Sequence, residues 1–239
     1  MRFEAPLIHG TLVRRYKRFL ADVVLENGTQ TTVHCPNTGS MMGCCTPGST
    51  VWLLPASNPA RKYPLGWELV EVEPAVLVGI NTGRSNALVA EALERGMIPE
   101  LAAYGSVRRE VKVPGTRSRI DFLLSGHPRD SDCYLEVKNV TAAVSGDNAF
   151  FPDAVSTRAA RHLDELAALV SSGHRSAMCF CVQRADVNRV RPADGIDPAY
   201  GKALRRAVSG GVEVYALRAK VGTTGVRLEE RIPVELDAH

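Results

Sequence analysis

The sequence lacks any long apolar run. No segment approaches the roughly 18 consecutive apolar residues of a membrane-spanning helix, so we expect no membrane partner. The opening residues, Met1-Arg2-Phe3-Glu4-Ala5-Pro6, lack the apolar core of a secretory signal, which predicts a cytoplasmic protein. Internal repeats and low-complexity tracts are absent too, and 45% hydrophobic against 23% charged residues is typical of a globular chain rather than a disordered one.

The sequence also lacks a strong excess of charge of one sign. A net charge of +3 over 239 residues permits a nucleic-acid partner without requiring one, so the positions of the cations matter more than their sum. This length accommodates one large domain or two smaller ones. It leaves open whether the chain forms a homodimer.

Closely spaced cysteines of the kind that hold structural zinc are absent. Cys35 and Cys44 are nine residues apart and Cys44 and Cys45 are adjacent, and neither spacing matches a Cys-x₂₋₄-Cys knuckle. We therefore favour a Pro-Asn-Thr-Gly turn at residues 36–39 with incidental, reduced thiols around it. The other cysteines lie in apolar, strand-like segments, at Cys133, Cys179 and Cys181.

The first 82 residues have the pattern of a small β-barrel. Asn27-Gly28 is a strong two-residue hairpin signal between two strand-like segments. Short strands of this kind are typical of an OB barrel, whose open face commonly binds nucleic acid or oligosaccharide. We predict an all-β, OB-like barrel over residues 1–82. Its strands are expected at residues 7–13, 19–25, 30–35, 50–54 and 67–72.

Two runs in this region mix cations with aromatic rings. Arg14-Arg15-Tyr16-Lys17-Arg18-Phe19 is the longer run, and Arg61-Lys62-Tyr63 is the shorter. Cations neutralise phosphates, and a flat ring gives a base a surface on which to stack. The alternative is a solvated strand with a tyrosine packed at its edge. Two such runs favour nucleic-acid binding, by Arg14, Arg15, Tyr16, Lys17, Arg18, Arg61 and Lys62.

Beyond residue 82, helices alternate with strands. Helices are expected at residues 86–95, 154–172 and 198–209, with Gly96 ending the first and Asp153 capping the second. The order of elements predicts an α/β domain with a mixed central sheet over residues 83–239. Its strands are expected at residues 107–113, 118–124, 134–139, 176–183, 212–217 and 226–234.

Two of these strands would bring opposite charges to one surface. Apolar and polar residues alternate in both, which places Asp121 beside Glu136 and Lys138 on one face. Two carboxylates are ligands that Mg²⁺ or Mn²⁺ accepts, and such a metal lowers the pKa of bound water and polarises a phosphate. The alternative is a salt-bridged sheet surface, worth only about 0.2–1 kcal/mol. We favour a metal site of Asp121 and Glu136, with Lys138 stabilising the charge of the transition state.

This arrangement resembles the PD-(D/E)xK nuclease superfamily from Asn86 to Gln183, with Asp121 on one strand and Glu136-x-Lys138 on the next. The resemblance implies that an acid of the first helix joins the catalytic site, and Glu91 is the matching residue. It also implies that Arg158 and His162 of the second helix lie near the same pocket. Arg119 shares the polar face of Asp121 and is counted with them as a nucleic-acid ligand. The alternatives are a solvated Glu91 and a His162 whose role is only in packing.

Five stretches together resemble the sugar fermentation stimulation protein A (SfsA) family of bacteria and archaea. They are residues 15–22, 34–39, 118–122, 136–138 and 151–155, and the similarity extends from about Phe3 to Pro233. The resemblance implies an OB-type barrel joined to a PD-(D/E)xK-like domain, DNA binding without marked sequence preference, and a link to the regulation of maltose or other sugar metabolism.

We call Asp121 and Glu136 the acidic pair. Because this pair is intact beside Lys138, the sequence favours cleavage of double- or single-stranded DNA as the activity. Two alternatives stay open. One is a regulatory DNA-binding protein that keeps the nuclease fold without its chemistry. The other is a barrel that binds RNA or an oligosaccharide.

Overall fold

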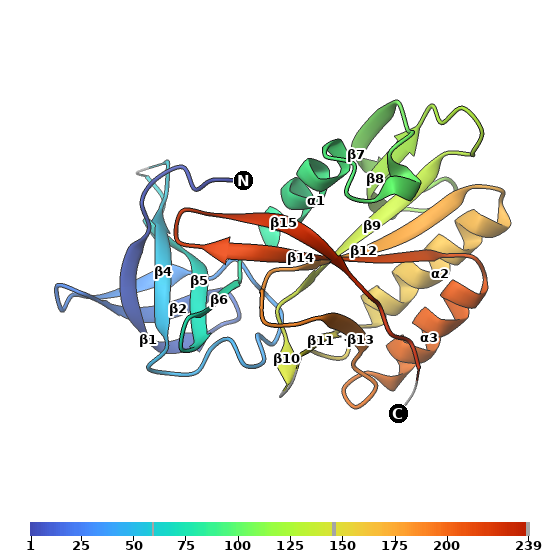
Figure 1. Ribbon diagram of the computed structural model, residues 1–239. Coiled ribbons are helices and arrows are strands. Elements are labelled where there is room, and N and C mark those ends of the chain that lie inside the picture. The colour runs from blue at the N-terminus through green and yellow to red at the C-terminus, as the bar shows by residue number, and fades with distance from the viewer. Residues whose placement is uncertain (59, 145–146, 238–239) are drawn as a thin grey trace.

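The computed structural model describes residues 1–58, 60–144 and 147–237, which form a barrel followed by an α/β domain (Figure 1). The strands of the barrel sheet have the order β3-β2-β1-β4-β5-β6. A parallel pairing of β3 with β5, at His34 and Gly66, closes the barrel. The strands are β1 (Ile8–Tyr16), β2 (Leu20–Leu25), β3 (Gln30–His34), β4 (Thr50–Pro55), β5 (Leu65–Glu73) and β6 (Val76–Gly79).

The barrel interior is filled by the apolar residues that alternate along its strands. Leu12, Val23 and Val33 are at most 1% exposed. Trp67 is fully buried, and its indole Nε1 donates a hydrogen bond to the carbonyl oxygen of Leu69 at 2.8 Å. The five predicted strands are therefore present, and the short β6 adds a further strand that leads out of the barrel.

The α/β domain is built on a mixed sheet with the strand order β15-β14-β12-β9-β8-β7. Its three central strands are parallel, and antiparallel strands flank them on both sides. The strands are β7 (Ser106–Lys112), β8 (Arg119–Ser125), β9 (Cys133–Val140), β12 (Arg175–Val182), β14 (Glu213–Gly222) and β15 (Gly225–Ile232). A second, small sheet has the order β10-β11-β13, with β10 (Ala143–Val144), β11 (Asn148–Phe151) and β13 (Arg189–Pro192).

Helices cover both faces of this sheet (Figure 1). The helices α2 (Thr157–Ser171) and α3 (Pro198–Ser209) pack on one face, and α1 (Ser85–Glu94) packs on the other. The 3₁₀ turns η1 (Thr82–Arg84) and η2 (Pro99–Leu101) flank α1. The central strand β12 is buried from Ser176 to Val182: Met178 and Phe180 face α2 and α3, while Cys179 and Cys181 face α1. None of the helices in the described part of the chain has the length and apolar character of a membrane crossing.

The start of α2 differs from the prediction. Ser156 is the N-cap, and its hydroxyl oxygen accepts a hydrogen bond from the backbone nitrogen of Ala159 at 3.1 Å. Asp153 instead accepts hydrogen bonds from the Ser40 hydroxyl at 3.0 Å and from the backbone nitrogen of Met41 at 3.0 Å. Asp153 is thus engaged with the barrel, Ser156 caps the helix in its place, and α2 begins three residues later than predicted.

Asp153 is one of several contacts that join the two domains. The backbone nitrogen of Gly79 donates to the Gln183 carbonyl at 2.8 Å, where β6 leaves the barrel. Residues 1–3, which we expected to belong to the barrel, lie against β15: Arg2 forms a β-bridge with Gly225. The barrel and the α/β domain are thus joined at the loop 37–41, at β6 and by the first residues of the chain.

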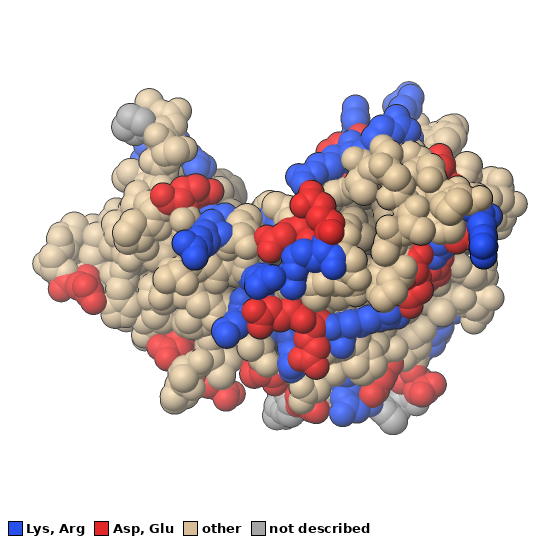
Figure 2. All heavy atoms as spheres, turned by 45° about the horizontal axis from the view of Figure 1, so that its top comes forward, with Lys and Arg blue, Asp and Glu red and all other residues tan. Residues whose placement is uncertain are grey.

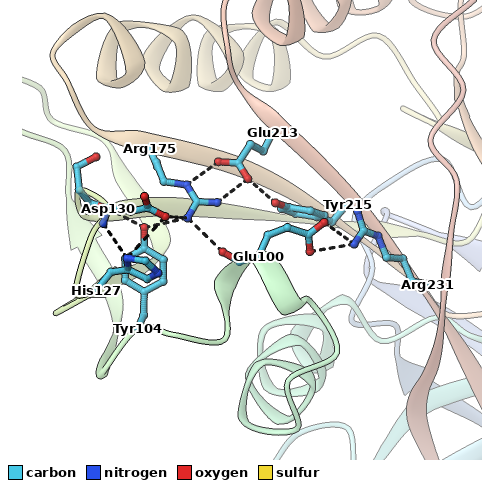
Figure 3. Close-up of polar contacts among 9 residues, drawn as sticks. Glu100, Tyr104, His127, Asp130, Arg175, Glu213, Tyr215 and Arg231 are labelled. Carbon is cyan, nitrogen blue, oxygen red and sulfur yellow. Dashed lines mark hydrogen bonds and ion pairs between the residues drawn. The ribbon is translucent and has the colours of Figure 1, made fainter.

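A network of charged side chains closes the end of the sheet where β12 and β14 begin (Figure 3). Arg175 donates from Nε and Nη2 to the two carboxylate oxygens of Glu213, both at 2.8 Å, and from Nη1 to Asp130 at 3.0 Å. Arg231 pairs with Glu100 of η2 at 2.7 Å. We call these residues, with Tyr104 and Tyr215, the Arg175 network.

Candidate active site

Asp121 lies on β8 with its carboxylate turned toward β9 and the start of α1. Its Oδ1 accepts a hydrogen bond from Nδ2 of Asn86 at 2.8 Å, and its Oδ2 accepts one from the backbone nitrogen of Val137 at 2.7 Å. Burial and the neighbouring charge of Glu136 raise the pKa of Asp121, and these two hydrogen bonds only partly oppose the rise. A nearby cation would relieve the repulsion between the two carboxylates.

Glu136 lies on β9 and is only 4% exposed. Its Oε1 is 2.6 Å from the ammonium nitrogen of Lys138 and 2.5 Å from Nδ1 of His162. Burial alone would raise the pKa of Glu136, but the hydrogen bond from His162 and the charge of Lys138 outweigh it and lower the pKa below its usual range. Glu136 is therefore a buried acid that His162 and Lys138 keep ionised.

The second oxygen of Glu136 has no partner. Its Oε2 is buried and accepts no hydrogen bond from any residue that the structure describes. A buried carboxylate oxygen without a donor is costly, by about 1–3 kcal/mol or more. An unsatisfied oxygen of this kind, beside a second carboxylate, is what a cation-binding site provides before the cation is bound.

Asp121 and Glu136 are the side chains that could hold a Mg²⁺ or Mn²⁺ ion, since such ions accept oxygen ligands. Among residues 1–58, 60–144 and 147–237, no three His, Cys, Asp or Glu side chains are grouped as ligands of one metal ion. Asp121 and Glu136 would supply two carboxylates, and water or phosphate oxygens would fill the remaining positions. That is the usual manner of binding Mg²⁺, which keeps several waters.

A cavity of about 530 Å³ opens beside these carboxylates. Asp121, Glu136 and His162 border it on the side of the sheet. The rest of its lining is mainly basic, because it includes one acid, Glu110, and four arginines, Arg117, Arg119, Arg158 and Arg161. The structure therefore brings Arg119, Arg158 and His162 to the cavity of the acidic pair. Sequence reasoning missed Arg117 and Arg161, although Arg161 is one helical turn from Arg158 and Arg117 is two residues before Arg119.

Glu91 is placed elsewhere. Its carboxylate accepts a hydrogen bond from the Met1 amino group at 2.8 Å and lies 3.8 Å from Arg227 and 3.9 Å from Arg95. The residue of α1 that reaches Asp121 is Asn86. These two residues are five positions apart, which is about 140° around a helix of 3.6 residues per turn, so they cannot face the same site. The prediction that Glu91 joins the acidic pair is corrected accordingly.

The cations of the first barrel run are largely engaged within the barrel. Arg15 donates to the carbonyl oxygens of Asn37 and Gly39 at 2.9 and 2.8 Å, and Arg18 donates to that of Thr38 at 2.7 Å. These guanidinium groups fix the loop 37–39, so their sequence pattern reflects a structural role.

The other members of the two runs lie at the barrel surface. Arg14 pairs with Asp22 at 2.8 Å, and the Tyr16 hydroxyl donates to the same carboxylate at 3.1 Å. Lys17 is exposed at the tip of the β1–β2 hairpin, and Arg61 and Lys62 are exposed before β5. None of them lines the cavity of the acidic pair.

The cysteines are free thiols. Cys35 and Cys44 are buried, and burial raises the pKa of both. The Cys35 thiol lies 3.4 Å from the sulfur of Met41, inside the barrel core. The thiols of Cys35 and Cys44 therefore pack in the core of the barrel.

The chain matches two family descriptions, in the order of its domains. Residues 13–80 match the SfsA N-terminal OB domain, and residues 83–225 match the sugar fermentation stimulation protein RE domain. The predicted fold class, an OB barrel followed by an α/β domain with a mixed sheet, is confirmed.

Similar proteins cover almost the whole chain. The sugar fermentation stimulation protein homologue of Alkalilimnicola ehrlichii is 56% identical over 98% of this chain and 99% of its own. That of Thioalkalivibrio sulfidiphilus is 57% identical over 99% and 98%. The structure of Pyrococcus furiosus SfsA in complex with Ca²⁺ has a TM-score of 0.88 at 25% identity and covers 98% of both chains. This chain therefore belongs to the sugar fermentation stimulation protein (SfsA) family.

Proposed function

We propose that this protein binds DNA with little sequence preference and hydrolyses its phosphodiester bonds in a reaction that depends on Mg²⁺ or Mn²⁺. The observation that carries the proposal is the buried Oε2 of Glu136, which lies unpartnered among the described residues beside Asp121 and a basic cavity. The family name adds a connection with sugar fermentation, and we extend the proposal to the regulation of maltose or other sugar metabolism.

The chain's own groups have distinct tasks in this proposal. Asp121 and Glu136 would hold the metal, which would supply polarisation of the phosphate and a lower pKa for a bound water. Lys138, whose ammonium is 2.6 Å from Glu136, keeps that acid ionised and stabilises the negative charge that develops on the phosphate. His162 fixes the orientation of Glu136 from α2. The Ca²⁺ complex of the Pyrococcus furiosus relative supports a site for a hard cation with oxygen ligands.

The surface around the cavity supports a polyanionic substrate. Figure 2 shows Lys and Arg side chains gathered at the upper right of the molecule, where β7 and β8 lie in Figure 1. Arg108, Arg109 and Lys112 are exposed on β7, the edge strand that precedes the arginines of the cavity rim. Cations in such positions contact phosphates without distinguishing bases, which is binding of low specificity.

A cleavage assay tests the catalytic half of the proposal. Plasmid and single-stranded DNA are incubated with Mg²⁺ or Mn²⁺, using wild type, Asp121→Ala and Lys138→Ala. We expect metal-dependent cleavage that both substitutions abolish. Glu91→Gln is the matched control, because it alters a carboxylate outside the site and should retain cleavage. Cleavage that survives both site substitutions would point to a contaminating nuclease and would contradict the proposed site.

A binding assay in rising salt tests the other half. Each phosphate contact that is lost should reduce the slope of log K against log salt by about one, so Arg158→Ala should flatten the slope by that amount. Binding of an oligosaccharide would show almost no salt dependence. Binding of RNA in preference to DNA would instead favour an RNA-binding barrel.

A non-catalytic DNA-binding regulator is the second candidate. The observation that favours it is the closed hydrogen bonding of Asp121, since both of its oxygens already accept a donor. Lys138 is likewise paired with Glu136. Tight DNA binding without cleavage under any divalent metal would favour this candidate over the nuclease.

A further inference from the structure

A second cavity, of about 360 Å³, lies where the barrel meets the α/β domain. The barrel contributes the loop 37–39, which Arg15 and Arg18 hold in place. The α/β domain contributes the end of β9, the segment that follows it, and β11. We call it the junction cavity. Its lining is Asn37, Thr38, Gly39, Thr82, Lys138, Asn139, Thr141, Ala142, Phe150, Phe151, Asp153 and Arg158.

The junction cavity adjoins the cavity of the acidic pair. Arg158 borders both of them. Lys138 borders the junction cavity, while its ammonium contacts Glu136, which borders the other. A phosphate held beside Glu136 would therefore have its neighbouring nucleotide next to the junction cavity. The two cations lie between these positions, where the backbone of a nucleic-acid strand would pass.

The lining of the junction cavity suits a nucleobase. Phe150 and Phe151 of β11 supply aromatic surface, and Phe151 is held by ring contacts with Phe180 and Tyr200 at 5.7 and 5.3 Å between centroids. Flat rings offer a base a stacking surface that tolerates any sequence. Half-buried Phe150 is the ring that can be altered without disturbing that aromatic cluster.

The polar groups of the cavity are fixed in orientation. Oδ1 of Asn139 accepts hydrogen bonds from Ser85 at 2.9 Å and Gln183 at 2.6 Å, which leaves the amide nitrogen of Asn139 as a donor. Asp153 is the one acid of the lining, and its Oδ2 is bound to Ser40 and to the backbone of Met41. The charge that would repel a nucleotide is thus directed toward the barrel loop.

We propose that the junction cavity receives one unpaired nucleotide of the strand whose phosphate lies at Glu136 and Lys138. The inference rests on the proposed function and deepens it by naming the substrate class. A cavity of about 360 Å³ is near the lower end of the usual 300–1,000 Å³ for small-ligand sites, so it accommodates one nucleotide and excludes a base pair. A base can enter only after it leaves the helical stack, which is least costly in single strands, frayed ends and mismatches.

Binding of a single strand and of a blunt duplex of equal length tests the inference. Fluorescence anisotropy is measured with Ca²⁺ present, and a gel verifies that the DNA stays intact. We expect wild type to bind the single strand at least about fivefold more tightly than the duplex, because only an unpaired base can stack on the aromatic rings of the cavity. Phe150→Leu keeps the apolar packing but removes the flat ring, so it should abolish most of this preference and leave duplex binding unchanged.

Phe19→Leu is the matched control, since Phe19 is an exposed aromatic of the barrel, 46% exposed and outside the cavity. It should leave both affinities unchanged, and thermal melting verifies that both variants are folded. Equal binding of both DNA forms by wild type, or no effect of Phe150→Leu, overturns the inference while DNA binding stands. If Phe19→Leu lost the preference for the single strand, the base would be bound at the barrel hairpin, and the inference would be overturned. Wild type that binds neither form contradicts the proposed function itself.

Discussion

Two charged clusters lie on the same sheet and differ in how completely their carboxylate oxygens are hydrogen-bonded. In the Arg175 network, each carboxylate oxygen of Glu213 accepts a hydrogen bond from Arg175. In the acidic pair, both donors of Glu136 contact Oε1, and Oε2 is buried with no donor in the described part of the chain. The first arrangement is complete within the protein. The second leaves one buried oxygen of Glu136 without a donor among the described residues, and there we propose that a metal ion binds.

Exposure to water sharpens the difference. The Glu213 side chain is 29% exposed, so water can hydrate it, whereas the Glu136 side chain is 5% exposed. Charged side chains that are paired with one another contribute to stability. A buried carboxylate that is incompletely paired is instead available to bind a ligand. Each cluster therefore predicts a different response when one of its members is changed.

Neutralising one acid in each cluster should separate catalysis from stability most clearly. We expect Glu136→Gln to reduce DNA cleavage at least about a hundredfold, because even partners of metal ligands alter activity by 10–100-fold. Glu213→Gln should leave the cleavage rate unchanged. Initial rates on plasmid DNA measure both variants, and an equal loss in the two would remove the distinction.

Breaking the Arg175 network should mainly lower stability. Arg175→Met removes the guanidinium donors of Glu213 and Asp130 and leaves Glu213 only the hydrogen bond from the Tyr215 hydroxyl, so we expect the free energy of unfolding to fall by about 1–3 kcal/mol. Arg206→Met removes an exposed pair with Asp164 and should change it by no more than about 0.5 kcal/mol. Urea denaturation at neutral pH measures both. Similar losses would mean that the network adds nothing beyond an ordinary surface pair.

A divalent metal should stabilise the protein through the acidic pair alone. At a free Mg²⁺ concentration ten times the Kd, binding to the folded state adds about 1.4 kcal/mol to the free energy of unfolding. Thermal melting with and without Mg²⁺ should show this increase in wild type and in Glu213→Gln. It should be absent in Glu136→Gln, and an unchanged increase in that variant would place the metal elsewhere.

The pH dependence of stability should give the smallest effect. The pKa of Asp121 is raised in the folded state, so its ionisation opposes folding as pH rises above the ordinary pKa of aspartate. Asp121→Asn should therefore be more stable than wild type at neutral pH, with the difference vanishing in acid. Glu136 has a lowered pKa, so its contribution is present at neutral pH and is lost as pH falls through the folded-state pKa. Urea denaturation of Asp121→Asn across this range measures the first effect, and a less stable variant at neutral pH would contradict it.

Alternation along two strands predicted that Asp121, Glu136 and Lys138 would lie together. The period of two in β9 places Glu136 and Lys138 on one face, where the Lys138 ammonium donates to Glu136, and Asp121 borders the same cavity as Glu136. A β-strand has only two faces, so a side chain that is assigned by alternation can be misplaced in only one way. The prediction of the barrel and of the mixed sheet succeeded for the same reason.

Helix α1 and the barrel cations show where sequence patterns are insufficient. A helix presents residues in all directions, and Asn86 rather than the predicted Glu91 reaches Asp121 because of the side of α1 that meets β8. Arg15 and Arg18 carry the pattern of a phosphate-binding run, but their partners are carbonyl oxygens of a loop some twenty residues later. Asp153 likewise has the residue type of an N-cap, but its Oδ2 accepts hydrogen bonds from a loop of the other domain. The role of each of these side chains is set by partners that are distant in the sequence, and a local sequence pattern carries no information about those partners.

That last contact bears on how the two halves can be recombined. A side chain at Gly39 would place its Cβ 2.8 Å from an oxygen of Asp153, so the loop and the acid fit only as a pair. Anyone who grafts this barrel onto a different partner, or exchanges barrels between relatives, must transfer Gly39 and Asp153 together. The two domains are therefore not independent modules at this contact, because a residue of the barrel and a residue of the α/β domain restrict each other's substitution.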